Sequence, residues 1–145
     1  MSFSLTQTNK KTGYIKSKDN TPLFYRFYGV ESPKGSVLLI HGFGEHSGRY
    51  AHVIERLQSE GFQVFCVDFR GHGHSQGTRG DVEAFSRYEE DVWVALQHIT
   101  AHSAAKIFVL AHSMGALVSL HLAAKGGLPV DGMVLSCPLF ALKMA

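Results

Sequence analysis

The chain has 145 residues, of which 45% are hydrophobic and 18% are charged. This composition is typical of one soluble globular domain and argues against a disordered chain. The formal net charge of +2 at pH 7 is too small to indicate a nucleic-acid partner. The basic residues are spread out except for one cluster near the N-terminus: Lys10, Lys11, Lys16 and Lys18. We interpret this cluster as a solvated edge, with weak attraction to anionic lipid as the alternative.

The first fourteen residues lack the apolar core of a signal peptide, and no window reaches the apolar length of a membrane span. We therefore expect a cytoplasmic protein, and peripheral contact with a membrane stays open. Cys66 and Cys137 lie within or at the end of apolar runs, where a free thiol behaves as a small hydrophobe. We expect no disulfide between them.

The order of elements predicts the fold class. Two stretches rich in aromatic and β-branched residues, 12–15 and 22–28, flank a turn-forming Lys18-Asp19-Asn20 and predict an antiparallel hairpin. After the hairpin, strands and helices alternate: strands at 37–40, 62–67, 107–110 and 133–135, and helices at 50–57, 85–99 and 114–122. This alternation predicts an α/β domain, with a mostly parallel sheet and helices on both faces. No linker or internal repeat divides the chain.

A serine stands at one of these strand-to-helix junctions. Ala111-His112-Ser113-Met114-Gly115 matches the nucleophile elbow G-x-S-x-G, except that alanine replaces the first glycine. Small residues are needed on both sides because the turn is tight. A serine there would have its hydroxyl above the sheet, next to the unpaired N–H groups of a helix start. The alternative is a serine that acts as a plain N-cap.

Three loops follow the carboxyl ends of predicted parallel strands, which is where open α/β sheets bind ligands. They begin at His41, at Asp68 and at Ser113. In this architecture an oxyanion hole takes one N–H from the residue after the nucleophile, here Met114, and one from the loop after the third strand, here Phe43.

Two other kinds of site compete for these loops. Gly71-His72-Gly73 begins like a dinucleotide-binding loop, but Gln76 stands where the third glycine is required. The nine histidines include His72 and His74 on one short loop, yet no carboxylate or cysteine within that loop completes a metal ligand set. We expect neither a cofactor nor a metal.

Three blocks together resemble the monoacylglycerol lipase and lysophospholipase group of α/β-hydrolases. They are His41-Gly42-Phe43-Gly44-Glu45-His46-Ser47-Gly48-Arg49-Tyr50, Asp68-Phe69-Arg70-Gly71-His72-Gly73-His74-Ser75 with the following Arg79-Gly80, and His112-Ser113-Met114-Gly115. The resemblance implies an α/β-hydrolase fold with an eight-stranded sheet, of which the first six strands are present. It also implies a serine nucleophile at Ser113, oxyanion donors at Phe43 and Met114, and hydrolysis of a monoacylglycerol or lysophospholipid ester. Residues 1–145 would form the N-terminal part of one domain, ending where the family's cap begins, at 138–142.

The triad acid and histidine follow the nucleophile in this fold. After Ser113 the chain offers only His121 and Asp131, and we expect neither to reach it, since His121 lies eight positions along the helix, about 12 Å away. We therefore expect the chain alone to be inactive. The alternative is a non-catalytic, hydrolase-like module or an inactive fragment that binds an acyl ligand or a partner. We also expect self-association through the last predicted strand, which would be an exposed sheet edge.

Overall fold

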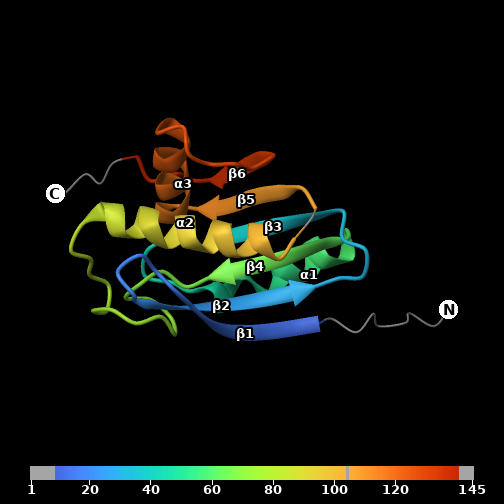
Figure 1. Ribbon diagram of the computed structural model, residues 1–145, viewed down its shortest axis with the longest axis horizontal. Coiled ribbons are helices and arrows are strands. Elements are labelled where there is room, and N and C mark those ends of the chain that lie inside the picture. Colours follow the sequence, from blue (N-terminus) through green and yellow to red (C-terminus); the bar gives the residue numbers. More distant parts are fainter. Residues whose placement is uncertain (1–8, 104, 141–145) are drawn as a thin grey trace.

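A computed structural model describes residues 9–103 and 105–140 of the chain (Figure 1). The described part contains six strands, three α-helices and one 3-10 turn. The strands are β1 (Asn9–Lys16), β2 (Pro22–Gly29), β3 (Gly35–Ile40), β4 (Phe62–Val67), β5 (Ile107–His112) and β6 (Gly132–Ser136). The helices are η1 (Ser47–Tyr50), α1 (Ala51–Ser59), α2 (Phe85–Ala101) and α3 (Met114–Ala124).

The strands form one sheet in the order β1-β2-β4-β3-β5-β6. The hairpin β1–β2 is antiparallel, and β2 joins β4 antiparallel, whereas β4, β3, β5 and β6 run parallel to one another. The prediction of a mostly parallel sheet behind an opening hairpin is confirmed. The sheet order also places Cys66 on β4 and Cys137 just after β6, three strands away, and both thiols are free.

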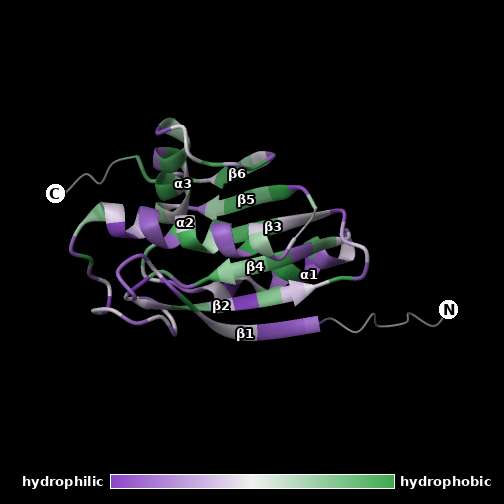
Figure 2. Cartoon of the chain, in the orientation of Figure 1, coloured by the Kyte–Doolittle hydropathy of each residue, from purple (hydrophilic) through white to green (hydrophobic). Residues whose placement is uncertain are grey.

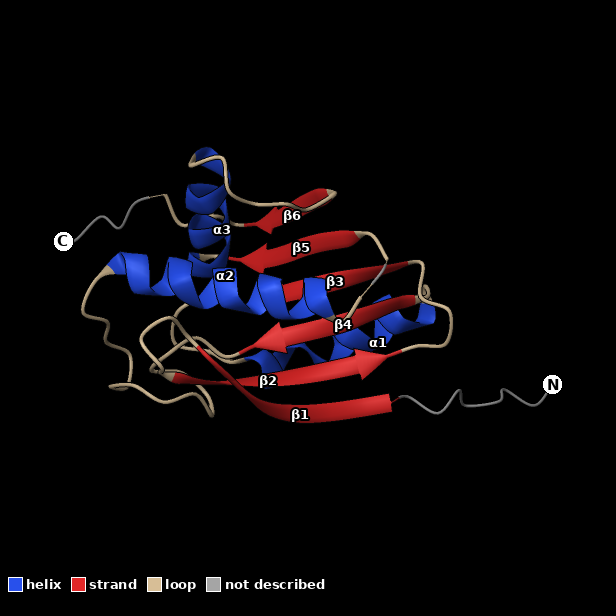
Figure 3. Ribbon diagram, in the orientation of Figure 1, coloured by secondary structure: helices blue, strands red, loops and turns tan. Residues whose placement is uncertain are grey.

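Helices cover both faces of the sheet, as predicted (Figure 3). Alternate residues of the central strands point to opposite faces because the side-chain period of a strand is two. Leu38, Phe65 and Val109 pack with residues of α2 and α3 on one face. Leu39, Val64 and Cys66 pack with Ile54 of α1 on the other face. Figure 2 shows the result: hydrophobic colour runs through β3, β4 and β5, and hydrophilic colour over the first half of β1.

Most elements extend one to three residues beyond their expected bounds, and two of these differences have a clear local cause. The helix predicted from Tyr50 begins as the 3-10 turn η1, which starts where the His46 side chain accepts the Gly48 N–H, and the α-helix itself begins at Ala51. β5 continues two residues beyond Leu110, to His112, because Ala111 and His112 still pair with β6. The strand therefore carries the chain directly to Ser113.

None of the helices within 9–103 and 105–140 is both long enough and apolar enough to cross a membrane.

Candidate functional site

Ser113 lies between the end of β5 and the start of α3, in a left-handed backbone conformation with φ 51° and ψ −114°. This region is costly for a residue with a Cβ, and such strain persists only where the surrounding structure imposes it. Two hydrogen bonds do so: the Ser113 N–H donates to the Ser136 carbonyl at 2.9 Å, and its carbonyl accepts from the Leu117 N–H at 3.1 Å. The Ser113 side chain makes no capping hydrogen bond, which excludes the plain N-cap interpretation.

Two glycines let neighbouring backbone approach Ser113. A Cβ on Gly115 would lie 2.4 Å from the His41 carbonyl oxygen, so only glycine fits where α3 crosses the end of β3. A Cβ on Gly42 would lie 3.1 Å from Ser113 Cβ, so the loop after β3 runs directly beside the serine. Ala111, the departure from the elbow pattern, is fully buried without a clash. The structure thus brings together the His41 and Ser113 loops predicted to converge.

His41 fixes the orientation of the peptide that joins Gly42 to Phe43. Its Nε2 accepts the Phe69 N–H at 3.0 Å, so in the neutral ring Nδ1 carries the proton and donates to the Gly42 carbonyl at 2.6 Å. Burial lowers the pKa of His41 to about 4, which keeps the ring neutral at pH 7. Because a trans peptide places its C=O and N–H on opposite sides, the Phe43 N–H points away from the His41 ring.

Glu45 fixes the amide side of Gly42, whose carbonyl is bound by His41. Its Oε1 accepts the Gly42 N–H at 2.7 Å and also the Tyr50 hydroxyl. Burial acts to raise the pKa of Glu45, but the bonds from Tyr50 and Gly42 outweigh it and hold that pKa below its usual value. With the Gly42 N–H and C=O both engaged, the Phe43 N–H is the next free donor of this loop, and the Phe43 ring lies exposed to solvent.

The third loop, from Asp68 to Gly77, is tied to the first through Asp68. Its Oδ1 accepts the Ser47 N–H at 2.8 Å, and its Oδ2 accepts the His74 N–H at 3.0 Å. Burial acts to raise the pKa of Asp68, but hydrogen bonds from Ser47 and His74 keep that pKa below its usual value. The carboxylate is therefore a structural bridge between the loops after β3 and β4.

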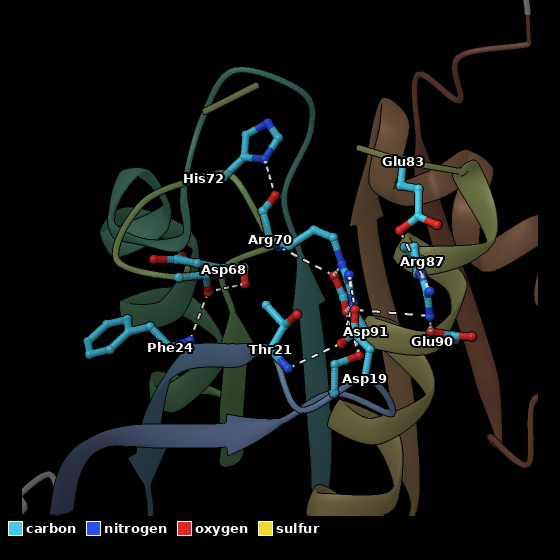
Figure 4. Close-up of polar contacts among 12 residues, drawn as sticks. Asp19, Thr21, Phe24, Asp68, Arg70, His72, Glu83, Arg87, Glu90 and Asp91 are labelled. Atoms are coloured by element: carbon cyan, nitrogen blue, oxygen red, sulfur yellow. Dashed lines mark hydrogen bonds and ion pairs between the residues drawn. The ribbon is translucent and has the colours of Figure 1, made fainter. Parts of the chain in front are cut away.

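His72 is the least satisfied group near the site. It is 4% exposed, and its Nδ1 lies 3.0 Å from the Arg70 carbonyl, to which it must donate (Figure 4). Its Nε2 is buried without a hydrogen-bond partner among the described residues. The His72 ring stands edge-on to the ring of Phe43, at a centroid distance of 5.4 Å.

His121 and Asp131 are engaged away from Ser113. His121 faces α2, where its Nδ1 lies 3.1 Å from Glu89 Oε1. Asp131 accepts the Ile107 N–H at the amino end of β5, whereas Ser113 follows the carboxyl end. Six strand residues, roughly 20 Å, separate these two ends. Neither side chain is placed to activate Ser113.

From the sequence we predicted roles for Ser113, Phe43 and Met114, but not for the residues that support them. His41 and Glu45 stood in the motif blocks without an assigned role, because their partners Phe69 and Gly42 cannot be recognised from the pattern. A detectable signal was the run of glycines and polar residues directly after an apolar strand, which indicates a structured loop. Across 9–103 and 105–140, no group of three histidine, cysteine, aspartate or glutamate side chains is close enough together to hold a metal ion.

A mostly parallel sheet with helices on both faces and a strained serine at a strand-to-helix turn defines an α/β-hydrolase. Residues 31–145 match the family described as "Serine aminopeptidase, S33", and the chain belongs to this family. Among curated relatives, a monoglyceride lipase homolog of Monkeypox virus is 35% identical over 88% of this chain and 47% of its own length. The monoacylglycerol lipase of Mycolicibacterium smegmatis is 40% identical over 73% of this chain and 38% of its own.

Solved structures give the same result. The monoacylglycerol lipase of Paleococcus ferrophilus aligns with a TM-score of 0.71 and 34% identity, covering 82% of this chain and 44% of that protein. A thermostable carboxyl esterase of Bacillus coagulans, solved with glycerol, aligns with a TM-score of 0.76 and 28% identity over 87% of this chain and 43% of its own. The chain spans less than half the length of these relatives.

Proposed function

We propose that this chain carries the nucleophile half of a serine hydrolase that cleaves carboxylic esters of monoacylglycerols or lysophospholipids. The observation that supports this most is the left-handed conformation of Ser113, held between β5 and α3 with the Gly42 backbone packed beside it. Backbone strain at a half-buried turn such as this one is typical of a functional position. The names of the relatives, monoglyceride lipases and esterases, support the ester as the substrate class.

In the proposed reaction Ser113 Oγ attacks the ester carbonyl carbon, and a base takes the hydroxyl proton. The N–H groups of Phe43 and Met114 stabilise the oxyanion: Met114 is the first residue of α3 and has no acceptor inside the helix, and the Phe43 N–H is oriented by His41. Collapse of the intermediate transfers the proton to the leaving oxygen, releases the alcohol and leaves an acyl group on Ser113. Water then attacks the acyl-enzyme and releases the carboxylic acid.

Neither His121 nor Asp131 supplies the base, since His121 is hydrogen-bonded to Glu89 and Asp131 to the Ile107 N–H. We propose that an acid and a histidine from outside residues 1–145 complete the triad in a longer protein, and that the chain alone is inactive or nearly so. Residues 1–145 then form the N-terminal part of one domain, followed by a cap from 138–142, of which 141–142 lie outside the described residues. Peripheral contact of the complete enzyme with lipid fits this substrate class.

Covalent labelling with a fluorophosphonate probe tests the proposal. The chain and a longer protein that contains it would be labelled alongside their Ser113→Ala variants. Ser136→Ala serves as the matched control, because this serine lies beside Ser113 and is hydrogen-bonded to its N–H only through its backbone carbonyl. We expect labelling of the longer protein that Ser113→Ala abolishes and Ser136→Ala preserves, with little labelling of the short chain.

A second candidate function is that of a non-catalytic, hydrolase-like module that binds an acyl ligand or a partner. It is favoured because His121 and Asp131 are hydrogen-bonded away from Ser113. Absence of labelling in the longer protein would overturn the enzyme proposal and favour this module. Labelling of the short chain at the same rate as the longer protein would show instead that the base lies within residues 1–145.

A further inference from the structure

A hollow of about 350 Å³ lies at the opposite end of the sheet from Ser113. Its floor is formed by Tyr25 and Phe27 of β2 and by Phe65 of β4, and its wall by His98 and His102 at the end of α2. The hollow reaches the amino end of β4 at Gln63, whereas the three loops of the candidate site leave the carboxyl ends of the parallel strands. A volume of this size is within the range of small-molecule sites.

Rings line most of the hollow, those of Tyr25, Phe27, Phe65, His98 and His102, and among them Phe65 is almost fully buried. The rings of Tyr25 and Phe65 stack at a centroid distance of 5.0 Å, and the ring of His98 lies 5.2 Å from each of them. His102 continues the row, stacked on His98 at 4.3 Å. Aromatic side chains attract another flat ring in stacked or edge-on geometry. The shape and surface therefore favour a planar aromatic group as occupant.

The charge around the hollow is positive. Lys11 of β1 stands at its rim, and no aspartate or glutamate is among its lining residues. In the part of the chain that the structure describes, Lys11 forms no ion pair, whereas its neighbour Lys10 turns to the opposite face and lies over the Tyr28 ring. Burial and the neighbouring His102 lower the pKa of His98, so that the His98 ring is neutral at pH 7.

Two of the carbonyl groups at the end of α2 already accept hydrogen bonds. The His98 carbonyl accepts from His102 Nδ1 at 2.7 Å, and the Ile99 carbonyl from the His102 N–H at 3.2 Å. The Gln63 amide donates to Ser36 and Ser103. These two helix carbonyls, which would otherwise repel an anion, therefore already have donors, and the Lys11 ammonium is the charged group that lines the hollow.

We propose that this hollow binds a planar aromatic carboxylate, with its ring against Tyr25, Phe27 and His98 and its carboxylate toward Lys11. The site is separate from Ser113 and does not depend on the proposed hydrolase function. No bond is made or broken in it, so it is a binding site only.

Titration of the full chain with 2-naphthoate tests the proposal, with the imidazole proton signals of His98 and His102 as the NMR readout. We expect saturable binding with a dissociation constant of about 1 mM or tighter, as an efficiency near 0.3 kcal/mol per non-hydrogen atom implies. The ring current of the ligand would shift both histidine signals. No saturable shift at these two residues overturns the proposal.

Variants separate the two parts of the recognition. Lys11→Gln is expected to weaken 2-naphthoate about threefold, the effect of one exposed ion pair, and to leave neutral 2-naphthol unchanged. Lys10→Gln, on the other face of the same strand, is the matched control and should change neither. His98→Ala should weaken both ligands by roughly fivefold through lost stacking. If Lys10→Gln and Lys11→Gln weaken 2-naphthoate binding equally, the ligand is attracted only by the overall charge of the chain, and the proposed site is wrong.

Discussion

At the scale of single residues, the candidate site depends on groups whose own positions are fixed by hydrogen bonds. His41 is the central example, because one imidazole joins the loop after β4 to the peptide that presents the Phe43 N–H. Its side chain is completely buried, and both ring nitrogens are engaged. The ring can fill this role only in its neutral form, since protonation of Nε2 would remove the acceptor that Phe69 uses.

His41 therefore makes stability depend on pH. Its pKa is about 4 in the folded chain against 6.5 for an ordinary histidine, so the unfolded state binds more protons between these values. Stability should be complete above pH 6.5 and fall as the pH decreases toward 4, by on the order of 3 kcal/mol. Urea unfolding at a series of pH values measures how steeply the free energy of unfolding depends on pH. His41→Gln should reduce this slope, because the glutamine amide oxygen can still accept the Phe69 N–H but does not titrate.

His41→Gln should reduce the dependence of stability on pH without removing it. Burial also lowers the pKa of His98, and this histidine destabilises the folded chain in the same direction as the pH falls. His52→Gln, on the exposed face of α1, serves as the control and should keep the original slope. An unchanged slope in His41→Gln would contradict a buried, neutral His41.

At the scale of elements, one arginine connects the hairpin, the loop after β4 and α2 (Figure 4). Arg70 Nε and Nη2 donate to the two carboxylate oxygens of Asp91 at 2.9 and 2.6 Å, and Nη1 donates to Asp19 at 2.7 Å. Ser17 adds a hydrogen bond to Asp91 at 2.8 Å. The Arg70 guanidinium holds the pKa of Asp19 well below its usual range. The network anchors the start of the Asp68 loop to α2.

Breaking this network from one side should be costly. Asp91 is fully buried, so Asp91→Ala would leave the Arg70 charge without its main partner and should lower the free energy of unfolding by about 3 to 5 kcal/mol. Removing both charges with Arg70→Met and Asp91→Leu should recover a large part of this loss. The exposed pair Arg56–Glu60 offers a control, and Arg56→Met should cost at most about 1 kcal/mol.

Denaturant unfolding of these three variants and of the unmodified chain measures these differences. If Asp91→Ala lowers the free energy of unfolding no more than Arg56→Met does, the buried network does not stabilise the packing of the hairpin against α2.

At the scale of the whole molecule, the described sheet ends in β6, a strand with one neighbour. Val134 on this strand is 64% exposed. Beside it lies an apolar hollow of about 310 Å³ on the α1 side of the sheet, lined by residues that include Leu57, Phe108 and Val134. An exposed edge next to an apolar surface favours pairing with another chain.

We therefore expect the isolated chain to self-associate, and Val134→Lys to shift it toward monomer, because a charge on an edge strand opposes pairing. Sedimentation velocity over a range of concentrations measures the distribution. Tyr14→Lys, an equally exposed position on the opposite edge strand β1, is the matched control and should have little effect. A monodisperse monomer of the unmodified chain would contradict the prediction.

The elements that could be predicted from the amino-acid sequence are those whose signals are local. Apolar runs marked β3, β4 and β5, helical spacing marked α2, and the small residues around Ser113 marked the turn between β5 and α3. Such patterns are readable because the side-chain periods of strands and helices appear in neighbouring positions. The resemblance carried by the motif blocks then gave the family.

The contacts between residues far apart in the sequence could be seen only in the folded chain. The contact of Ser17 with Asp91 joins residues 74 positions apart, and that of His41 with Phe69 joins residues 28 apart. Pairings of this kind are set by sheet order and helix packing, so no local pattern encodes them. The same reason applies to the hollow beside His98, whose lining comes from β1, β2, β4 and α2 and exists only when these four elements are assembled.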